Sequence, residues 1–210
     1  MKIKTEDYIK IKKLYDYWCK TPTDINEHLP TIKKYADQCT HVTEFGVYLS
    51  KGSTWAFLMA CSDNKSIKYI SYDDKKRPQA IDTWNLVKNM DIDWTFNESD
   101  TTLMDPIEET DLLLIDTEHV YDVCSKELEI HASKVRKFII FHDTVSRWDI
   151  SPHPGSPSWL AKGNTRAPVR GIGPAITEFL EDNKNWTILE NRKNNNGLMI
   201  IANLGKKDVE

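Results

Sequence analysis

Short apolar runs alternate with amphipathic segments through the middle of the chain. Five runs predict buried strands, at residues 41–49, 67–74, 91–99, 111–116 and 137–143. Helical periodicity appears between them, in the segments 51–62, 80–90 and 118–135. Strands that alternate with helices form βαβ units, and continuous apolar strands suit a parallel sheet that is covered on both faces. We therefore expect an α/β fold with a doubly wound, Rossmann-like, mostly parallel sheet.

The two ends of the chain follow other patterns. The N-terminal part has helical periodicity, whereas the segment after the fifth strand loses its periodicity and is rich in Pro, Gly, Trp and Arg. A loop this long in a compact domain is usually functional or disordered. The last apolar runs flank an Asn/Gly turn, which predicts an antiparallel hairpin at the edge of the sheet. We expect a single domain over 1–210, with N-terminal helices at 1–40, βα units at 41–143, a substrate loop or lid at 144–173, a helix and hairpin at 174–204, and a disordered tail at 205–210.

Composition and charge exclude several classes of protein. The 210 residues suit one domain that buries a core without disulfides or structural metals. A formal net charge of −4, spread through mixed runs, provides no cationic surface for nucleic acid. The four cysteines form no C-x-x-C pair, which indicates neither a zinc cluster nor a disulfide framework and fits a reducing compartment. No segment resembles a signal peptide or a membrane span, so we expect a soluble intracellular protein.

Polar residues stand at all five predicted strand ends, where open parallel sheets bind their ligands. They are Glu44 to Gly46, Asp73 with Asp74, Ser99 with Asp100, Asp116 to His119, and His142 with Asp143.

The first two of these strand ends could bind a nucleoside cofactor. Gly46 permits close approach of the backbone, and a helix that begins at Ser53 or Thr54 offers donors to an anionic group. Tyr48 stands where the G-x-G-x-x-G motif has its second glycine, and any βα turn favours a glycine, so this motif alone is not diagnostic. Asp73 lies where a carboxylate could hold a ribose diol, although by itself it could equally cap a helix.

The fourth and fifth strand ends carry groups suited to metal binding and proton transfer. His119 follows Asp116 by three residues, and the next strand ends on His142 and Asp143. Because neighbouring strand ends converge, these carboxylates and imidazoles should meet in one crevice. Such a set suits Mg²⁺, Mn²⁺ or a similar ion, and a free histidine suits general-base catalysis. One histidine alone could cap a helix or bond a buried carbonyl, but two such motifs at successive strand ends favour a site.

Other aromatic and basic residues leave alternatives open. Trp148, His153, Trp159 and Arg166 could bind a polar ring substrate, or they could simply pin the long loop in place, and the two interpretations have equal weight. His28 is expected to be exposed to solvent.

In these motifs the chain resembles the class I S-adenosylmethionine-dependent methyltransferases. Within them it is most similar to the small metal-associated O-methyltransferases of the rhamnosyl O-methyltransferase and cephalosporin hydroxylase group. The resemblance spans residues 23–204 and implies the class I methyltransferase fold. Its segments are VTEFGVYLSKGST, YISYDD, FNESD, LLLIDTEHVYDVCSKELE, FIIFHDT, GIGPAITEFLEDNKNWTI and NNNGLMII.

The resemblance implies S-adenosylmethionine as cofactor and a role for each strand end. Glu44, Gly46, Val47, Ser53 and Thr54 would line the methionine part, Asp73 would hold the ribose, and Ser99 and Asp100 would approach the adenine. Asp116, His142 and Asp143 match ligands of a divalent ion, Mg²⁺ or Mn²⁺, with His142 in place of the usual carboxylate. His119 matches the general base, usually a lysine, and Asp116 would also take part in catalysis and cofactor binding.

These roles describe a metal-assisted O-methyltransferase of a carbohydrate hydroxyl, with a terminal deoxyhexose such as rhamnose as the preferred acceptor. Relatives in this group accompany glycosyltransferases and cap glycans, some of them in large algal viruses. The resemblance therefore implies association with, or fusion to, glycosyltransferases. It also implies a cytoplasmic location, which would be the cytoplasm of the host if the protein is viral. A catechol-like or antibiotic acceptor is the alternative within the same reaction. Two alternatives belong to other classes of protein. One is a metal-dependent hydrolase that uses Asp116, His142 and Asp143, and the other is a catalytically silent binding module that holds cofactor and glycan.

Overall fold

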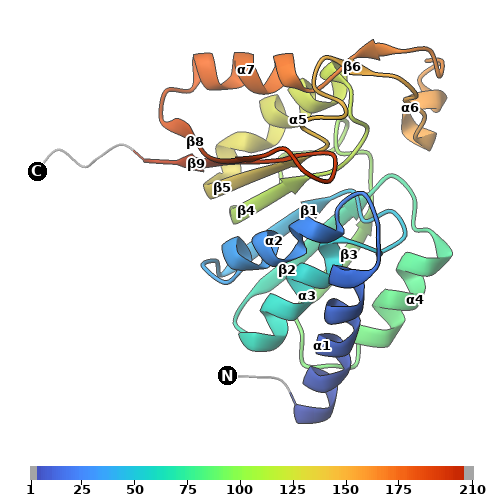
Figure 1. Cartoon of the computed structure of the whole chain (residues 1–210), viewed down its shortest axis with the longest axis vertical. Helices are drawn as coiled ribbons and strands as arrows, with labels where there is room; N and C mark the ends of the chain where they lie inside the picture. The colour runs from blue at the N-terminus through green and yellow to red at the C-terminus, as the bar shows by residue number, and fades with distance from the viewer. Residues whose placement is uncertain (1–3, 206–210) are drawn as a thin grey trace, which may run out of the picture.

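The computed structural model describes residues 4–205, in which helices cover both faces of a seven-stranded sheet (Figure 1). Its strands are β1 (His41–Phe45), β2 (Lys68–Asp73), β3 (Trp94–Glu98), β4 (Thr110–Ile115), β5 (Val135–His142), β8 (Trp186–Arg192) and β9 (Leu198–Asn203). The strand order is β3-β2-β1-β4-β5-β9-β8. Strands β1 to β5 run parallel, whereas β9 pairs antiparallel with both β5 and β8. The expected doubly wound sheet with a C-terminal antiparallel hairpin is therefore confirmed.

Two apolar layers hold the helices against the sheet. One face carries α1 (Thr5–Lys20), α2 (Leu29–Ala36), α3 (Ser53–Asp63) and α4 (Pro78–Val87), and the other carries α5 (Tyr121–His131) and α7 (Gly173–Asp182) (Figure 1). Strand β4 contributes to both layers: Leu112 and Leu114 pack into the first, while Leu113 and Ile115 pack into the second. Because successive side chains of a strand point to opposite faces, a strand covered on both sides reads as one unbroken apolar run.

The segment 144–173, predicted as a loop, contains short regular elements. Strands β6 (Ile150–Ser151) and β7 (Val169–Arg170) pair antiparallel, and α6 (Pro157–Ala161) lies between them in the chain. The segment is placed to one side of the molecule, beyond the end of the main sheet (Figure 1). Elements of two and five residues are too short to produce a detectable hydrophobic period, which is why the sequence did not reveal them.

The expectation that His28 is exposed is wrong. His28 lies in a single turn of 3-10 helix (Asn26–His28) and is fully buried. Its Nε2 lies 3.0 and 3.1 Å from the backbone oxygens of Asn194 and Asn195, in the turn between β8 and β9. Burial lowers the pKa of His28, so the neutral ring donates its Nε2–H to this turn. His28 therefore ties the N-terminal helices to the C-terminal hairpin.

The hairpin turn itself has the conformation that its residues favour. Asn195, Asn196 and Gly197 all have positive φ angles, of 45°, 66° and 95°. Asn and Gly are the residues that adopt this region most readily, so the Asn/Gly turn predicted from the sequence is confirmed.

Beyond the hairpin, the predicted tail at 205–210 lies outside the described residues apart from Gly205. Within residues 4–205, no helix combines the length and the apolar character needed to cross a bilayer.

Candidate active site

A cavity of about 710 Å³ opens at the carboxyl ends of the parallel strands. This volume is in the range of small-molecule and cofactor sites. The predicted site residues that line the cavity are Gly46, Val47, Ser53, Asp73, Ser99, Asp100, Asp116, His119, His153, Trp159 and Arg166. Five other predicted residues stand behind its wall or away from it, namely Glu44, Thr54, His142, Asp143 and Trp148.

The turn after β1 packs directly against the end of β4. Gly46 has a φ of +91°, and a Cβ atom at this position would lie 2.0 Å from the carbonyl oxygen of Asp116. The Asp116 N–H also donates to the Phe45 carbonyl oxygen at 3.0 Å. Only glycine allows this backbone approach, so Gly46 brings the predicted cofactor turn next to the Asp116 cluster.

Tyr48, which replaces the expected second glycine, is held by an acid of the neighbouring strand. Its φ is 47°, a conformation that glycine adopts more easily. The Tyr48 N–H donates to Asp73 Oδ2 at 2.6 Å, which fixes the turn in this conformation. The sequence motif is degenerate, but the turn it would form is present.

Glu44 is buried behind the cavity and ties three elements together. Its carboxylate accepts hydrogen bonds from Ser53 Oγ at 2.5 Å, from Thr54 Oγ1 at 3.0 Å and from the Tyr69 hydroxyl. These partners belong to the start of α3 and to β2. Burial raises the pKa of Glu44 to about 7. Glu44 and Thr54 thus set the position of the turn 46–52 instead of facing the cavity.

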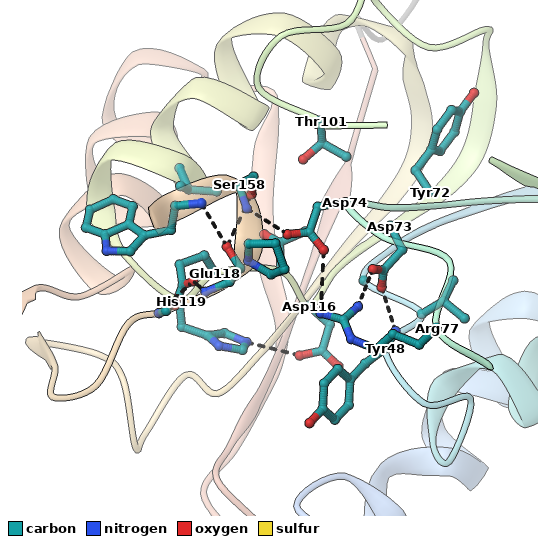
Figure 2. Close-up of a pocket in the computed structure, with 18 of the residues that line it drawn as sticks. Tyr48, Tyr72, Asp73, Asp74, Arg77, Thr101, Asp116, Glu118, His119 and Ser158 are labelled. Carbon is teal, nitrogen blue, oxygen red and sulfur yellow. Dashed lines mark hydrogen bonds and ion pairs between the residues drawn. The ribbon is translucent and has the colours of Figure 1, made fainter. Parts of the chain in front are cut away.

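Asp73 stands at the end of β2 with both carboxylate oxygens engaged (Figure 2). Arg77 Nη1 lies 2.5 Å from Asp73 Oδ1, and the Tyr48 N–H bonds Oδ2. The same guanidinium lies 3.6 Å from Asp74 Oδ1 and 4.8 Å above the Tyr48 ring. A ribose diol at Asp73 would therefore share this carboxylate with Arg77, a residue that the sequence did not single out.

Asp116 holds two imidazoles through one oxygen. His119 Nε2 and His142 Nδ1 each lie 3.0 Å from Asp116 Oδ1. The second nitrogen of His119 lies 3.3 Å from Asp143 Oδ2, and that of His142 lies 2.9 Å from the Asp24 carbonyl oxygen. Carboxylate and carbonyl oxygens only accept hydrogen bonds, so His142 carries protons on both nitrogens in this arrangement and His119 carries one on Nε2.

The charges of this cluster favour the protonated form of both rings. Burial alone would lower the pKa of His142, but the Asp116 carboxylate outweighs burial and raises it to about 9. Burial acts in the same direction on His119, but its hydrogen bond to Asp116 and the charges of Asp143 and Asp116 together outweigh burial and raise its pKa. Burial would raise the pKa of Asp116, but His142 and His119 together hold it below its ordinary value.

The donor atoms of Asp116, His119 and His142 lie within 4.8 Å of one another and could together hold a metal ion. The sequence suggested Asp143 in place of His119 as a ligand, but Asp143 is bonded to Ser146 Oγ at 2.6 Å and faces His119. Two imidazoles and one carboxylate suit Mn²⁺, Fe²⁺ or Zn²⁺ better than Mg²⁺, which prefers oxygen ligands. Any such ion must displace the protons of both rings.

Several lining residues were missed by the sequence analysis. Glu127, buried on α5, accepts hydrogen bonds from Thr101 Oγ1 at 2.5 Å and Thr117 Oγ1 at 3.0 Å, two hydroxyls on the cavity wall. Residues 23–25 also line the cavity. The Asp24 carbonyl oxygen accepts a hydrogen bond from His142 Nε2, which ties this segment to β5. Asp74 and Glu118 belong to the polar strand ends that the sequence indicated, but the sequence gave neither of them a role.

The four residues predicted to bind substrate occupy different places. Trp148 packs against Gly173, where a Cβ atom would lie 2.4 Å from the indole, and so it pins the segment 144–173. Trp159 is buried and donates its indole N–H to the Thr165 carbonyl at 2.9 Å, although one edge reaches the cavity. His153 and Arg166 are exposed and line the cavity.

The fold is shared with solved methyltransferase structures. A protein from Staphylococcus aureus described as a candidate caffeoyl-CoA O-methyltransferase aligns over 93% of this chain and 91% of its own, with a TM-score of 0.60 and 12% identity. A candidate O-methyltransferase from Klebsiella pneumoniae aligns over 95% and 90%, with a TM-score of 0.60 and 12% identity. The N-terminal domain of EvdMO1, crystallised in the presence of S-adenosylhomocysteine (SAH) and D-fucose, aligns over 84% and 80%, with a TM-score of 0.52 and 13% identity.

At these identities the likeness establishes the methyltransferase-type Rossmann fold. No protein-family profile matches the sequence, and no curated protein matches it either.

The buried carboxylate of Glu44 should make the stability of the protein depend on pH. Its pKa is about 7 in the folded protein against an ordinary 4.5, so its contribution is complete below about pH 4.5 and is lost as pH rises through 7. We expect the free energy of unfolding to fall between about pH 5 and about pH 8, and Glu44→Gln to remove on the order of 1–3 kcal/mol of that fall. Urea unfolding across this range measures the slope. The exposed Glu129 offers a control, because Glu129→Gln should keep the wild-type slope, whereas a wild-type slope in Glu44→Gln would contradict the assignment.

Proposed function

We propose that this protein is an S-adenosylmethionine-dependent O-methyltransferase that acts on a saccharide hydroxyl. The observation that supports this most directly is one cavity, in a methyltransferase-type fold, lined by both Asp73 at the end of β2 and the Asp116–His119 pair after β4. The first group suits the ribose of the cofactor, and the second suits removal of a proton from an acceptor.

The cofactor would lie along the ends of β1 to β4. Gly46, Val47 and Ser53 would line its methionine part, Asp73 would bind the ribose, and Ser99 with Asp100 would approach the adenine. Structures with the same fold support this choice of cofactor, because two of those with SAH bound align over 84% and 95% of this chain.

Methyl transfer needs alignment and one proton acceptor. The bond between the sulfonium sulfur and the methyl carbon breaks as the acceptor oxygen bonds that carbon, and SAH leaves with the bonding electron pair. The acceptor hydroxyl must lose its proton, and His119 is the imidazole that lines the cavity. One of its ring nitrogens would take this proton, with the ring held between Asp116 and Asp143. His119 must therefore be singly protonated at the start of the reaction.

A divalent metal fits the same cluster. Asp116, His119 and His142 would hold it, and Mn²⁺ fits their donor atoms better than Mg²⁺ does. In that case His119 would be a ligand instead of the base, and the acceptor hydroxyl would release its proton to water. A bound ion would supply Lewis acidity that lowers the pKa of an acceptor hydroxyl. Since the nitrogens of His119 and His142 that face Asp116 carry protons and the pKa of both rings is raised, binding of the ion should strengthen as pH rises.

A saccharide acceptor is supported by the chemistry of the cavity and by one structural relative. His153 and Arg166 offer hydrogen bonds to hydroxyl groups, and the edge of Trp159 that reaches the cavity offers an apolar surface. EvdMO1 was crystallised with D-fucose, a deoxyhexose like the rhamnose that we prefer as acceptor. A catechol-type acceptor is the second candidate, and the fold shared with the candidate caffeoyl-CoA O-methyltransferase favours it.

The proposal is tested first by binding and then by turnover. Isothermal titration with SAH should give a dissociation constant in the micromolar range. Transfer of labelled methyl from S-adenosylmethionine to methyl α-L-rhamnopyranoside, compared with transfer to catechol, then separates the two acceptor classes. Absence of SAH binding with and without Mn²⁺ would contradict the proposal and favour the metal-dependent hydrolase.

Removal of the Asp73 carboxylate should weaken cofactor binding. We expect Asp73→Ala to raise the dissociation constant of SAH by at least about tenfold, because the carboxylate that would accept hydrogen bonds from the ribose is lost and Arg77 loses its nearest acidic partner. Isothermal titration measures this change. Asp82→Ala, on the exposed side of α4, is the matched control and should bind SAH as wild type does.

Methyl transfer should depend on His119 in its singly protonated form. We expect His119→Ala to lower kcat by about 10²- to 10⁴-fold while SAH binding changes little. Because the pKa of His119 is raised, the wild-type rate should increase with pH through a value above the ordinary 6.5 of histidine. Initial rates between about pH 6 and about pH 9 provide the test. Wild-type activity in His119→Ala, or a rate that falls over this range, would show that another group is the base.

A further inference from the structure

Acidic side chains from three strand ends hold the segment that covers the cavity. We call residues 153–162 the lid segment. The N–H groups of Gly155 and Ser156 donate to Glu118, after β4, and the Ser158 N–H donates to Asp74 Oδ2, after β2, at 3.0 Å (Figure 2). Lys162 Nζ lies 3.0 Å from Asp100 Oδ2, after β3.

Glu118 makes the most specific of these contacts. Its Oε1 and Oε2 lie 3.0 and 2.9 Å from the Gly155 nitrogen, and Oε2 also accepts the Ser156 N–H. A carboxylate that accepts consecutive backbone N–H groups fixes both the position and the orientation of that backbone, and such charge-assisted bonds are stronger than neutral ones. The contact joins residues 37 and 38 positions apart in the chain.

The backbone held by Glu118 in turn positions the side chains of the lid segment. Ser156 caps α6, because its Oγ accepts the Trp159 N–H at 3.2 Å. Gly155 packs against Arg166 so closely that a Cβ atom there would lie 2.2 Å from the guanidinium. The places of Trp159 and Arg166 on the cavity wall therefore depend on the backbone that Glu118 holds.

Glu118 directly precedes His119, and this adjacency gives the contact a functional meaning. We propose that Glu118 is a positioning residue for the methyl acceptor. It fixes the lid segment, which contains His153 and Trp159 and packs against Arg166, relative to His119 on the same loop as Glu118. This inference rests on the proposed function of the cavity. Asp74 differs from Glu118, because Arg77 links it to Asp73, where the cofactor is expected to bind. Glu118 has no such link, so it should affect the acceptor and not the cofactor.

The substitution Glu118→Gln tests the contact, since an amide replaces one accepting oxygen by a donor that faces backbone N–H groups. Hydrogen exchange measured by mass spectrometry should be at least about tenfold faster in peptides covering residues 153–162, while the dissociation constant of SAH stays within about twofold of wild type. Glu129→Gln, on the exposed face of α5, is the matched control and should change neither quantity. Unchanged exchange in Glu118→Gln would overturn the proposal.

Kinetics separate positioning of the acceptor from a general structural role. With methyl α-L-rhamnopyranoside as acceptor, KM should rise at least about tenfold in Glu118→Gln, with kcat within about threefold of wild type. Faster exchange together with lost SAH binding would mean that Glu118 supports the whole site, and would overturn the specific role.

Two further outcomes are distinguishable. Should Glu118→Gln fail to fold, Glu118→Asp keeps the charge but withdraws the carboxylate by one methylene from the N–H groups of Gly155 and Ser156, and should produce the same faster exchange. Wild-type protein that binds no SAH would contradict the proposed function and with it the acceptor role, while the exchange experiment still decides whether Glu118 holds the lid segment.

Discussion

The candidate site depends on the place of Asp116, which joins three parts of the molecule. Its backbone N–H bonds the end of β1, and its carbonyl oxygen lies against Gly46, where no side chain would fit. Its carboxylate holds His119 from the following loop and His142 from β5. The parallel pairing of β1 with β4 and of β4 with β5 makes all of these contacts possible, because it brings three strand ends to one edge of the sheet. The turn after β1, His119 and the candidate metal ligands are therefore fixed relative to one another by the sheet.

The sequence predicted the fold well because strands that are buried on both faces appear in the sequence as continuous apolar runs. The run Leu112 to Ile115 faces two different apolar layers, which requires apolar residues at every position. It could not predict contacts that depend on a distant backbone. His28 gives no sign in the sequence that it bonds the turn at Asn194, and Arg77 gives none that it pairs with Asp73. Composition likewise could not separate Trp148, which packs on Gly173, from His153 and Arg166, which reach the cavity.

Most acids of the cavity are already engaged by protein groups, and this shapes the chemistry that the site can perform. Asp73 pairs with Arg77, Asp100 with Lys162, and Glu118 with backbone N–H groups of the lid segment. Ligands must therefore bind alongside these contacts, which favours a preorganised cavity over one that forms around its substrate. A shared fold at 12% identity is possible because the sheet requires only apolar runs and a few particular residues at the strand ends. The residues between them are free to determine which acceptor is bound.

The crystal structure of the protein with SAH would test the central claim most directly. The account predicts SAH in the cavity, with its ribose hydroxyls at Asp73, its adenine near Ser99 and Asp100, and its sulfur facing the Asp116–His119 pair. Crystals grown or soaked with saturating SAH that show the molecule elsewhere, or show an empty cavity, would contradict it.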